Sequence, residues 1–259
     1  MFKRAAVLVV SCGALLAGCG TDARVEDGEN EEIISNLVEA GFPADDIGVF
    51  GDAVYVGHDT EVSLDASREL LQRGEGSEEQ YCTTNLVGTS VTKICVNPTS
   101  TFNSYSRLSA GLDAALQNYN QLGLRIFFVR GPTTGCTANI TAQTMAGTGG
   151  SAGFPSNGRP YGTINIGVGL QSYSLDYNEH LITHELGHTI GLRHADYYNR
   201  SISCGGTATN EGTAGVGAVL IPGTPSTATP GGSIMNSCIP LDTNGEFTSS
   251  DITMLNYLY

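Results

Sequence analysis

The stretch that decides the fold runs from His184 to His194 and reads HELGHTIGLRH. His184 and His188 are four residues apart, so on a helix both imidazoles lie on one face, with their Cβ atoms about 5–6 Å apart. Gly191 can adopt a positive φ, end the helix and turn the chain back. His194 can then complete a three-histidine site. The pattern therefore predicts a helix over residues 177–190 that stops beside a metal ion.

The residue types around this turn favour a catalytic zinc. Zinc accepts imidazole nitrogens at roughly 2.0–2.1 Å, and a catalytic site keeps one position open beside three protein ligands. Glu185 follows the first ligand directly, so we expect its carboxylate to lie beside the ion and to act as general base and then as general acid. Zinc lowers the pKa of a bound water to about 7, which supplies a nucleophile. The alternative, a structural zinc, would usually have four protein ligands.

The motif resembles that of the metzincin clan, HExxHxxGxxH followed by a methionine turn. The sequence 233–236, Ser-Ile-Met-Asn, resembles this turn and implies that Met235 lies beneath the zinc. Residues 194–196 and the overall layout are most similar to the bacterial dual-action HEIGH (protease B-like) metallopeptidases, although Leu186 stands where the family name has isoleucine. The resemblance covers residues 80–259 and implies a zinc-dependent endopeptidase.

The pattern of the main domain, residues 80–259, predicts an α/β (α+β) fold with strands of mixed direction. Apolar spacing predicts a helix over 105–122 and a final helix over 249–258. Predicted strands span 90–96, 124–129, 139–145 and 163–166, with a flexible glycine segment over 147–153. The resemblance implies a metzincin-type zincin domain: a mixed twisted sheet, an active-site helix with a backing helix, and a loop-rich C-terminal subdomain. It also implies that substrate binds as an added strand near residues 153–155.

A small N-terminal segment, residues 31–79, precedes this domain. The pattern predicts a helix over 31–40, a strand or hairpin over 47–56 and a short helix over 67–73. The segment could be an inhibitory propeptide, because an acid such as Asp52 or Asp59 could displace a zinc-bound water. A solvated turn is the simpler interpretation of each acid.

The N-terminus resembles the signal peptide of a bacterial lipoprotein. Residues 1–18 have a basic start and an apolar stretch too short to span a bilayer permanently. Leu16-Ala17-Gly18-Cys19 resembles a lipobox, which implies cleavage before Cys19, a lipid on its sulfur, and a tether over residues 19–30. We therefore expect an exported, lipid-anchored protein on the outer membrane or surface of a Gram-negative bacterium. The alternative is an ordinary signal peptide and a secreted protein.

Charge excludes some partners. The chain has 26 acidic and 12 basic residues and a net charge of −14. Such a chain repels nucleic acid and anionic lipid surfaces, so we expect no nucleic-acid partner, and membrane contact only through the anchor. Acidity is compatible with calcium, but no specific motif supports it. We expect a monomer that acts on proteins or peptides.

Five cysteines remain beyond Cys12 and Cys19, and an exported protein can form disulfides. Cys82 and Cys95 could bridge neighbouring strands. Cys204 and Cys238 would close the long loop after the motif, which leaves Cys136 over. Sequence alone does not fix this connectivity.

Two polar residues near the motif each allow two interpretations. His180 lies one turn before His184, but only the later pair has Glu185 and Gly191 in register, so we expect His180 at the surface or around the site. Asp196 can orient a histidine ligand or tie down the turn that follows it.

Two other functions stay open. The chain could be a surface binding module that uses zinc only for structure, or an enzyme that cuts another acyl bond or one narrow target. Hydrolysis of casein that depends on the metal and on Glu185 would separate these from a broad endopeptidase.

Overall fold

The structure, a computed structural model, describes residues 22–71, 81–212 and 219–259. The expected signal peptide (1–18) and Cys19 lie outside the described residues. Among the helices of these three ranges, none has the length and apolar character needed to cross a bilayer.

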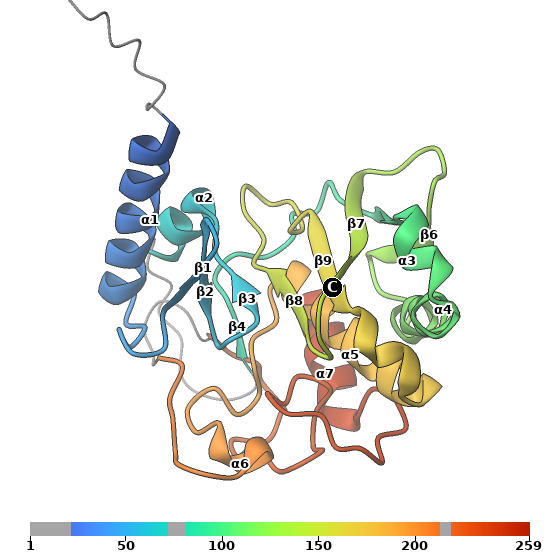
Figure 1. Cartoon of the computed structure of the whole chain (residues 1–259). Coiled ribbons are helices and arrows are strands. Elements are labelled where there is room, and N and C mark those ends of the chain that lie inside the picture. The colour runs from blue at the N-terminus through green and yellow to red at the C-terminus, as the bar shows by residue number, and fades with distance from the viewer. Residues whose placement is uncertain (1–21, 72–80, 213–218) are drawn as a thin grey trace, which may run out of the picture.

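A mixed sheet of eight strands organises the molecule (Figure 1). Its order is β1-β2-β3-β8-β9-β7-β5-β6. Strands β6, β5, β7 and β9 are parallel, β8 is antiparallel to β9, and β3 is parallel to β8. The bounds are β1 Gly48–Phe50, β2 Ala53–Val56, β3 Thr60–Glu61, β5 Lys93–Pro98, β6 Phe127–Arg130, β7 Ala138–Met145, β8 Gly150–Gly153 and β9 Thr163–Gly167. A separate two-stranded ladder joins β4 (Tyr81–Cys82) to β10 (Val219–Leu220).

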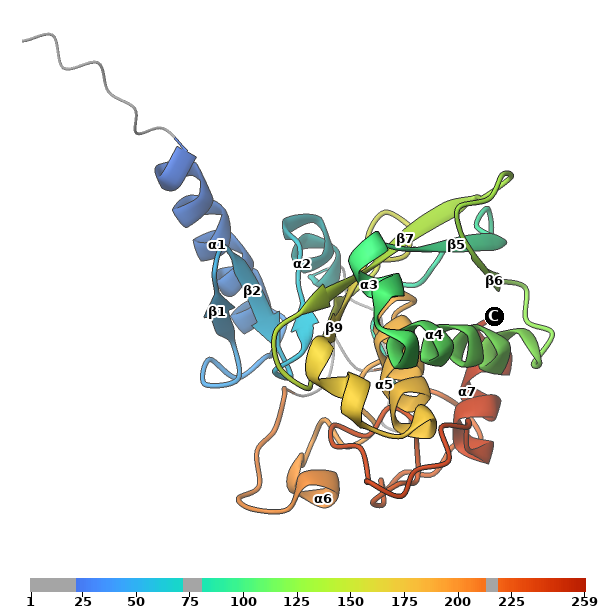
Figure 2. The same ribbon diagram turned by 45° about the vertical axis from the view of Figure 1, so that its right-hand side comes forward.

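Helices α4 and α5 pack against each other beside this sheet (Figure 2). Tyr119 of α4 is fully buried and donates its hydroxyl to the Thr183 carbonyl of α5 at 2.8 Å. The main hydrophobic core lies between these helices and the strands. Helix bounds are α1 Asp22–Glu39, α2 Leu64–Leu70, α3 Ser100–Ser104, α4 Ser106–Asn120, α5 Leu175–Thr189, α6 Ser201–Cys204 and α7 Ser249–Leu258, with a 3-10 turn over Val168–Ser172.

The N-terminal segment has a hydrophobic core of its own. Helices α1 and α2 pack against each other, and α1 packs on β2, on the opposite side of β8 from the main core (Figure 1). Phe154 is the one buried member of this cluster that the main domain supplies. The other members are Ile33, Leu37, Ala40, Phe42, Val54, Val56, Val62, Ala66 and Leu70. We call residues 22–71, with this core, the N-terminal unit.

The expected mixed α/β fold is confirmed, with local differences. The short helix expected over 67–73 is α2, which spans Leu64–Leu70. Helix α1 begins at Asp22, inside the expected tether, so residues 22–30 are helical. The segment 147–153, expected to be a flexible loop, contains strand β8. A Cβ at Gly153 would lie 2.6 Å from the Glu61 carbonyl, so glycine allows close approach of the neighbouring strand.

The disulfides correct one prediction. Cys95 bonds to Cys136, not to Cys82, so the prediction of a Cys82–Cys95 bridge was wrong. Parallel pairing of β5 with β7 brings Cys95 opposite Asn139, close to Cys136, a proximity that the sequence did not reveal. Cys82 is buried. Cys204 and Cys238 form a disulfide that closes the loop after the metal motif.

Candidate metal centre

Helix α5 carries the first two histidines to the centre of the molecule. Ser174 caps its N-terminus by accepting a hydrogen bond from the Tyr177 N–H. At its other end, the Leu192 N–H donates to the Gly187 carbonyl at 3.0 Å, and the Gly191 N–H donates to the His188 carbonyl at 2.9 Å. These two bonds form a Schellman motif, which requires a left-handed residue after the cap. Gly191 has φ 105° and fills that position, as the sequence predicts.

The chain that leaves Gly191 is held in its reversed course by β4. The Arg193 N–H donates to the Tyr81 carbonyl at 2.9 Å, and the Thr83 N–H donates to the Gly191 carbonyl at 2.8 Å. A Cβ at Gly191 would lie 2.5 Å from the Asn85 carbonyl, so a larger residue would disrupt this contact as well as the turn. The return brings His194 back to face α5.

Three imidazoles converge at this turn. His184 Nε2 lies 3.0 Å from His188 Nε2 and 3.2 Å from His194 Nε2. All three side chains are buried. Zinc with tetrahedral ligands at 2.0–2.1 Å separates neighbouring nitrogens by about 3.3 Å, so these separations fit a zinc site.

The hydrogen bonds of the Nδ1 atoms determine which nitrogen of each ring is available to bind a metal. His184 Nδ1 lies 2.8 Å from the Ile234 carbonyl, and His188 Nδ1 lies 2.9 Å from the Leu192 carbonyl. A carbonyl oxygen only accepts, so each Nδ1 carries a proton, and Nε2 is the nitrogen of each ring whose lone pair can bind a metal. Lone pairs that face each other at this distance repel, and a cation between them removes the repulsion. The donor set therefore fits the zinc that the motif predicts.

Glu211 orients the third histidine, and the sequence analysis missed it. Its Oε1 lies 2.7 Å from His194 Nδ1 and 3.4 Å from Arg200 Nη1. The Ser237 hydroxyl lies 3.3 Å from the same oxygen. A carboxylate in this position fixes the tautomer and makes the imidazole a stronger ligand. Glu211 lies 17 residues beyond His194 in an irregular polar stretch, so no local pattern identifies it.

Met235, which the resemblance places beneath the zinc, packs against α5. A Cβ at Gly187 would lie 2.7 Å from Met235 Sδ, so the sulfur packs directly against α5. The Ala195 N–H donates to the Met235 carbonyl at 2.7 Å, which ties the turn to the chain after His194. Asp251 accepts from the Ile234 N–H at 3.0 Å and also forms the capping box of α7. The last helix therefore holds the carbonyl that orients His184.

Glu185 is buried next to the three histidines with one oxygen unpartnered. Glu185 directly follows His184 on α5, and among the described residues no group hydrogen-bonds its Oε2. Gly150 of β8 lies so close that a Cβ there would collide with the Glu185 carboxylate. Burial, together with the negative charge of Asp59, raises the pKa of Glu185 well above its usual range. These features suit a group that accepts and returns a proton.

Asp59, for which a solvated turn was the simpler interpretation, lies at the metal site. Its Oδ2 is 3.2 Å from His194 Nε2 and 3.8 Å from His184 Nε2, and its Oδ1 is 3.7 Å from His188 Nε2. Burial alone would raise the pKa of Asp59, but the adjacent histidines lower it well below its usual range. Asp59 and the three histidines form one group with ligand atoms within 4.8 Å of one another.

The two ambiguous residues both have structural roles. His180 makes hydrogen bonds with the Thr243 hydroxyl at 2.7 Å and the Ile234 carbonyl at 3.2 Å, and burial beside His184 lowers its pKa to about 3. Its nitrogens are therefore used away from the metal. Asp196 is buried and accepts hydrogen bonds from Ser203 and Ser237. It holds the loop after the third histidine in place and, among the described residues, makes no hydrogen bond to a histidine.

Comparison with known proteins gives one family. The family model of the dual-action HEIGH metallo-peptidases matches residues 54–259, a range that includes Asp59. A search of curated proteins finds no match. Similar solved structures include High choriolytic enzyme 1, a hatching enzyme zinc-protease from Oryzias latipes (Medaka fish), at 17% identity and TM-score 0.44, covering 69% of this chain and 94% of that chain. Two structures of myroilysin have 14% identity and TM-score 0.39, covering 68% of this chain and 86% or 96% of theirs.

Proposed function

Because the chain belongs to the dual-action HEIGH metallo-peptidases, we propose that it is an endopeptidase for proteins outside the cytoplasm, with Glu185 as its general base. A zinc peptidase follows from the family and the donor set. The observation that carries the finer proposal is the buried Glu185 carboxylate, which lies beside three converging imidazoles and has one free oxygen.

The three histidines and Glu185 would have separate roles in peptide hydrolysis. Zinc, when bound, acidifies water and polarises the scissile carbonyl. His184, His188 and His194 would hold it, with their rings fixed by two backbone carbonyls and Glu211. Glu185 accepts a proton on its free oxygen and passes it to the leaving amine.

The side of β8 that pairs with β3 supports an extended peptide as substrate. The N–H groups of Ala152 and Phe154 point away from β9 and donate to the carbonyls of Asp59 and Glu61. An added strand binds through such main-chain groups, so recognition would depend on backbone more than on one side chain. This supports an enzyme that cuts within unfolded or extended segments.

Hydrolysis of casein tests this function. The Glu185→Gln variant keeps the shape of the side chain and removes the base, so we expect activity to fall by about 10²–10⁴-fold while zinc stays bound. Asp176→Asn, a change of the same kind on the exposed first turn of α5, is the matched control. Both variants are compared in the wild-type chain and in an Asp59→Ala background, and a chelator should abolish all activity. Zinc-loaded protein in both backgrounds that cleaves no member of a broad peptide library would favour the binding module.

We also propose that the protein is exported and lipid-anchored through Cys19. The lipobox-like sequence before Cys19 supports this. In a Gram-negative host that receives labelled fatty acid, the full chain should carry the label in the membrane fraction, and Cys19→Ser should lose it. A wild-type chain without label, free in the periplasm or medium, would contradict the anchor and favour secretion.

A further inference from the structure

The N-terminal unit covers the edge of the sheet beside the metal centre. Strand β3 pairs with β8, with Thr60 opposite Ala152 and Glu61 opposite Gly153. The Ala152 N–H donates to the Asp59 carbonyl at 3.1 Å, and the Phe154 N–H donates to the Glu61 carbonyl at 3.3 Å. Without β3, β8 would be the edge strand of the main-domain sheet. The backbone groups that an extended peptide would need are therefore already used.

The same strand presents Asp59 to the three histidines. A tetrahedral zinc at three Nε2 atoms leaves its fourth ligand about 3.3 Å from each of them. Asp59 Oδ2 lies 3.2 Å from His194 Nε2 and 3.8 Å from His184 Nε2, and the other oxygen, Oδ1, lies 3.7 Å from His188 Nε2. Its side chain is 17% exposed, so the carboxylate turns inward, away from solvent. Carboxylate oxygen is an accepted zinc ligand at roughly 2.0–2.2 Å.

We propose that the N-terminal unit is a built-in inhibitor, in which Asp59 is the fourth zinc ligand and β3 occupies the substrate edge of β8. The proposal rests on the endopeptidase function above. Catalysis needs one metal position free for water and substrate. Asp59 fills that position, and Thr60–Glu61 fills the adjoining strand site. The full chain is therefore latent until the unit moves away.

The turn before Asp59 is fixed by contacts to both parts of the molecule. The Gly57 N–H donates to Asp46 at 3.0 Å within the N-terminal unit. Arg200 of the main domain donates to the Gly57 carbonyl at 2.8 Å and also contacts Glu211, the partner of His194. The position of Asp59 is thus set by the same arginine that supports the third histidine.

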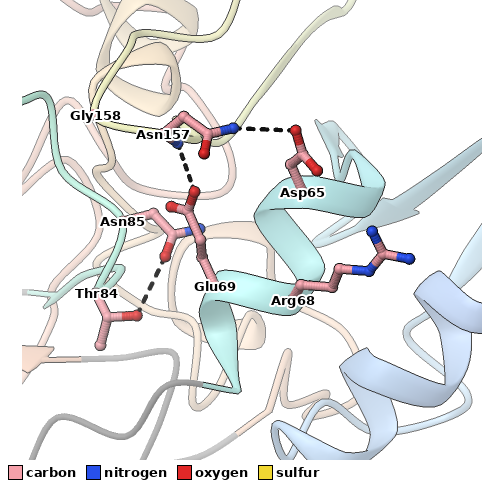
Figure 3. A pocket seen from close by; sticks show the side chains of 7 residues that line it. All are labelled: Asp65, Arg68, Glu69, Thr84, Asn85, Asn157 and Gly158. Atoms are coloured by element: carbon pink, nitrogen blue, oxygen red, sulfur yellow. Dashed lines mark hydrogen bonds between the residues drawn. The ribbon is translucent and has the colours of Figure 1, made fainter.

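A second contact attaches α2 to the main domain (Figure 3). The side chain of Asn157 donates to Asp65 at 3.0 Å, and its backbone N–H donates to Glu69 at 2.5 Å. Asn85 donates to the Ala66 carbonyl at 3.1 Å. Asp65, Glu69, Asn85 and Asn157 line a polar cavity of about 540 Å³ between α2 and the main domain. Helix α2 therefore contacts the main domain through hydrogen bonds around an open pocket.

The separate cores make the unit removable. Apart from Phe154, the buried apolar residues beneath α1 and α2 all belong to the N-terminal unit. Departure of the unit would therefore leave the main core, which lies on the other side of β8, intact. An inhibitor must leave without unfolding the enzyme, and this division of the cores permits it.

Cobalt in place of zinc gives a test that does not depend on turnover. Residues 19–259 are loaded with cobalt(II), whose visible spectrum reports its ligands. The protein is then titrated with a peptide hydroxamate, which needs an open metal position to bind. The Asp59→Ala and Asp59→Asn variants should bind the hydroxamate with a spectral change and cleave casein at least about tenfold faster than the wild-type chain. Asp52→Ala, an exposed acid in the β1–β2 turn, is the matched control and should behave as wild type.

The outcomes separate this proposal from the peptidase function. Wild-type and Asp59 variants with the same cobalt spectra, hydroxamate affinity and activity would overturn the inhibitor while leaving the peptidase in place. A spectral difference and hydroxamate binding without cleavage of any substrate would keep Asp59 as a ligand and overturn the peptidase. Circular dichroism checks folding, and Asp59→Asn preserves the side-chain shape if Asp59→Ala does not fold.

Discussion

The molecule has two hydrophobic cores that differ in how they relate to the metal. The main core, beneath the sheet and between α4 and α5, holds the helix that carries His184, Glu185 and His188. The smaller core belongs to the N-terminal unit, which carries β3 and Asp59. One core thus builds the site, whereas the other keeps it closed. Loss of stability should therefore have opposite effects on activity in the two regions.

A pair of identical substitutions tests this contrast most strongly. Leu112 of α4 and Leu37 of α1 are both fully buried, one in each core. Leucine-to-alanine changes in cores cost about 2–5 kcal/mol of unfolding free energy. Leu37→Ala should loosen the N-terminal unit and raise the rate of casein cleavage, whereas Leu112→Ala should lower the melting temperature and not raise the rate. Equal effects of the two changes on activity would show that the cores are not functionally separate.

Glu211 tests the contribution of the main domain to zinc binding. Glu211→Gln removes the negative charge from His194 Nδ1, so zinc affinity should fall by about 10–100-fold. The loss should be the same in the wild-type chain and in Asp59→Ala, since Glu211 supports the site whether it is open or closed. Competition with a chromogenic chelator measures it, and Glu246→Gln, at an exposed position, is the control. Unchanged affinity would mean that Glu211 does not orient the ligand.

The attachment of α2 should have a smaller effect. Glu69→Ala removes the acceptor of the Asn157 N–H at an exposed contact, where a hydrogen bond contributes about 1 kcal/mol. Activity of the full chain should rise about fivefold or less. Glu32→Ala breaks an ion pair with Arg68 inside the N-terminal unit and should leave activity unchanged. If both variants responded alike, the effect would come from the stability of α2 and not from its docking.

The raised pKa of Asp46 predicts that the stability of the N-terminal unit depends on pH. Burial, with a contribution from Glu211, raises its pKa from 3.8 to about 6, although Gly57, His58 and Arg193 oppose the shift. The unfolded chain then loses its proton near pH 4 and the folded chain near pH 6, so the folded state binds more protons between these values. Stability should fall as pH rises through this window. The melting temperature of Asp46→Asn relative to wild type should rise from pH 4 to pH 6 and then stay level, and a constant difference would contradict this assignment.

The sequence predicted what depends on local pattern. The spacing of His184, His188 and Gly191 predicts the helix, its end and the return of the chain, because each follows from backbone geometry within one turn. The helix over 105–122 and the capped final helix follow from apolar period and capping in the same way. Met235 was placed by resemblance, and it packs under α5 as expected.

Contacts between distant segments could not be predicted. Glu211 and Asp59 reach the site from irregular or turn segments, and single acids in such segments have no distinguishing pattern. Cys136 pairs with Cys95 because β5 and β7 are parallel neighbours, which a single sequence does not show. Strand β8 was interpreted as a flexible loop because its glycines, which make room for Glu185 and β3, have low strand propensity.

A crystal structure of zinc-loaded residues 19–259, with anomalous data at the zinc edge, tests most directly whether Asp59 is the fourth zinc ligand. The account predicts one anomalous peak among the Nε2 atoms of His184, His188 and His194, with an Asp59 oxygen as fourth ligand at about 2.0–2.2 Å. A zinc ion with a water in that position and Asp59 turned to solvent would contradict the closed state, and the absence of zinc from the three histidines would contradict the whole account.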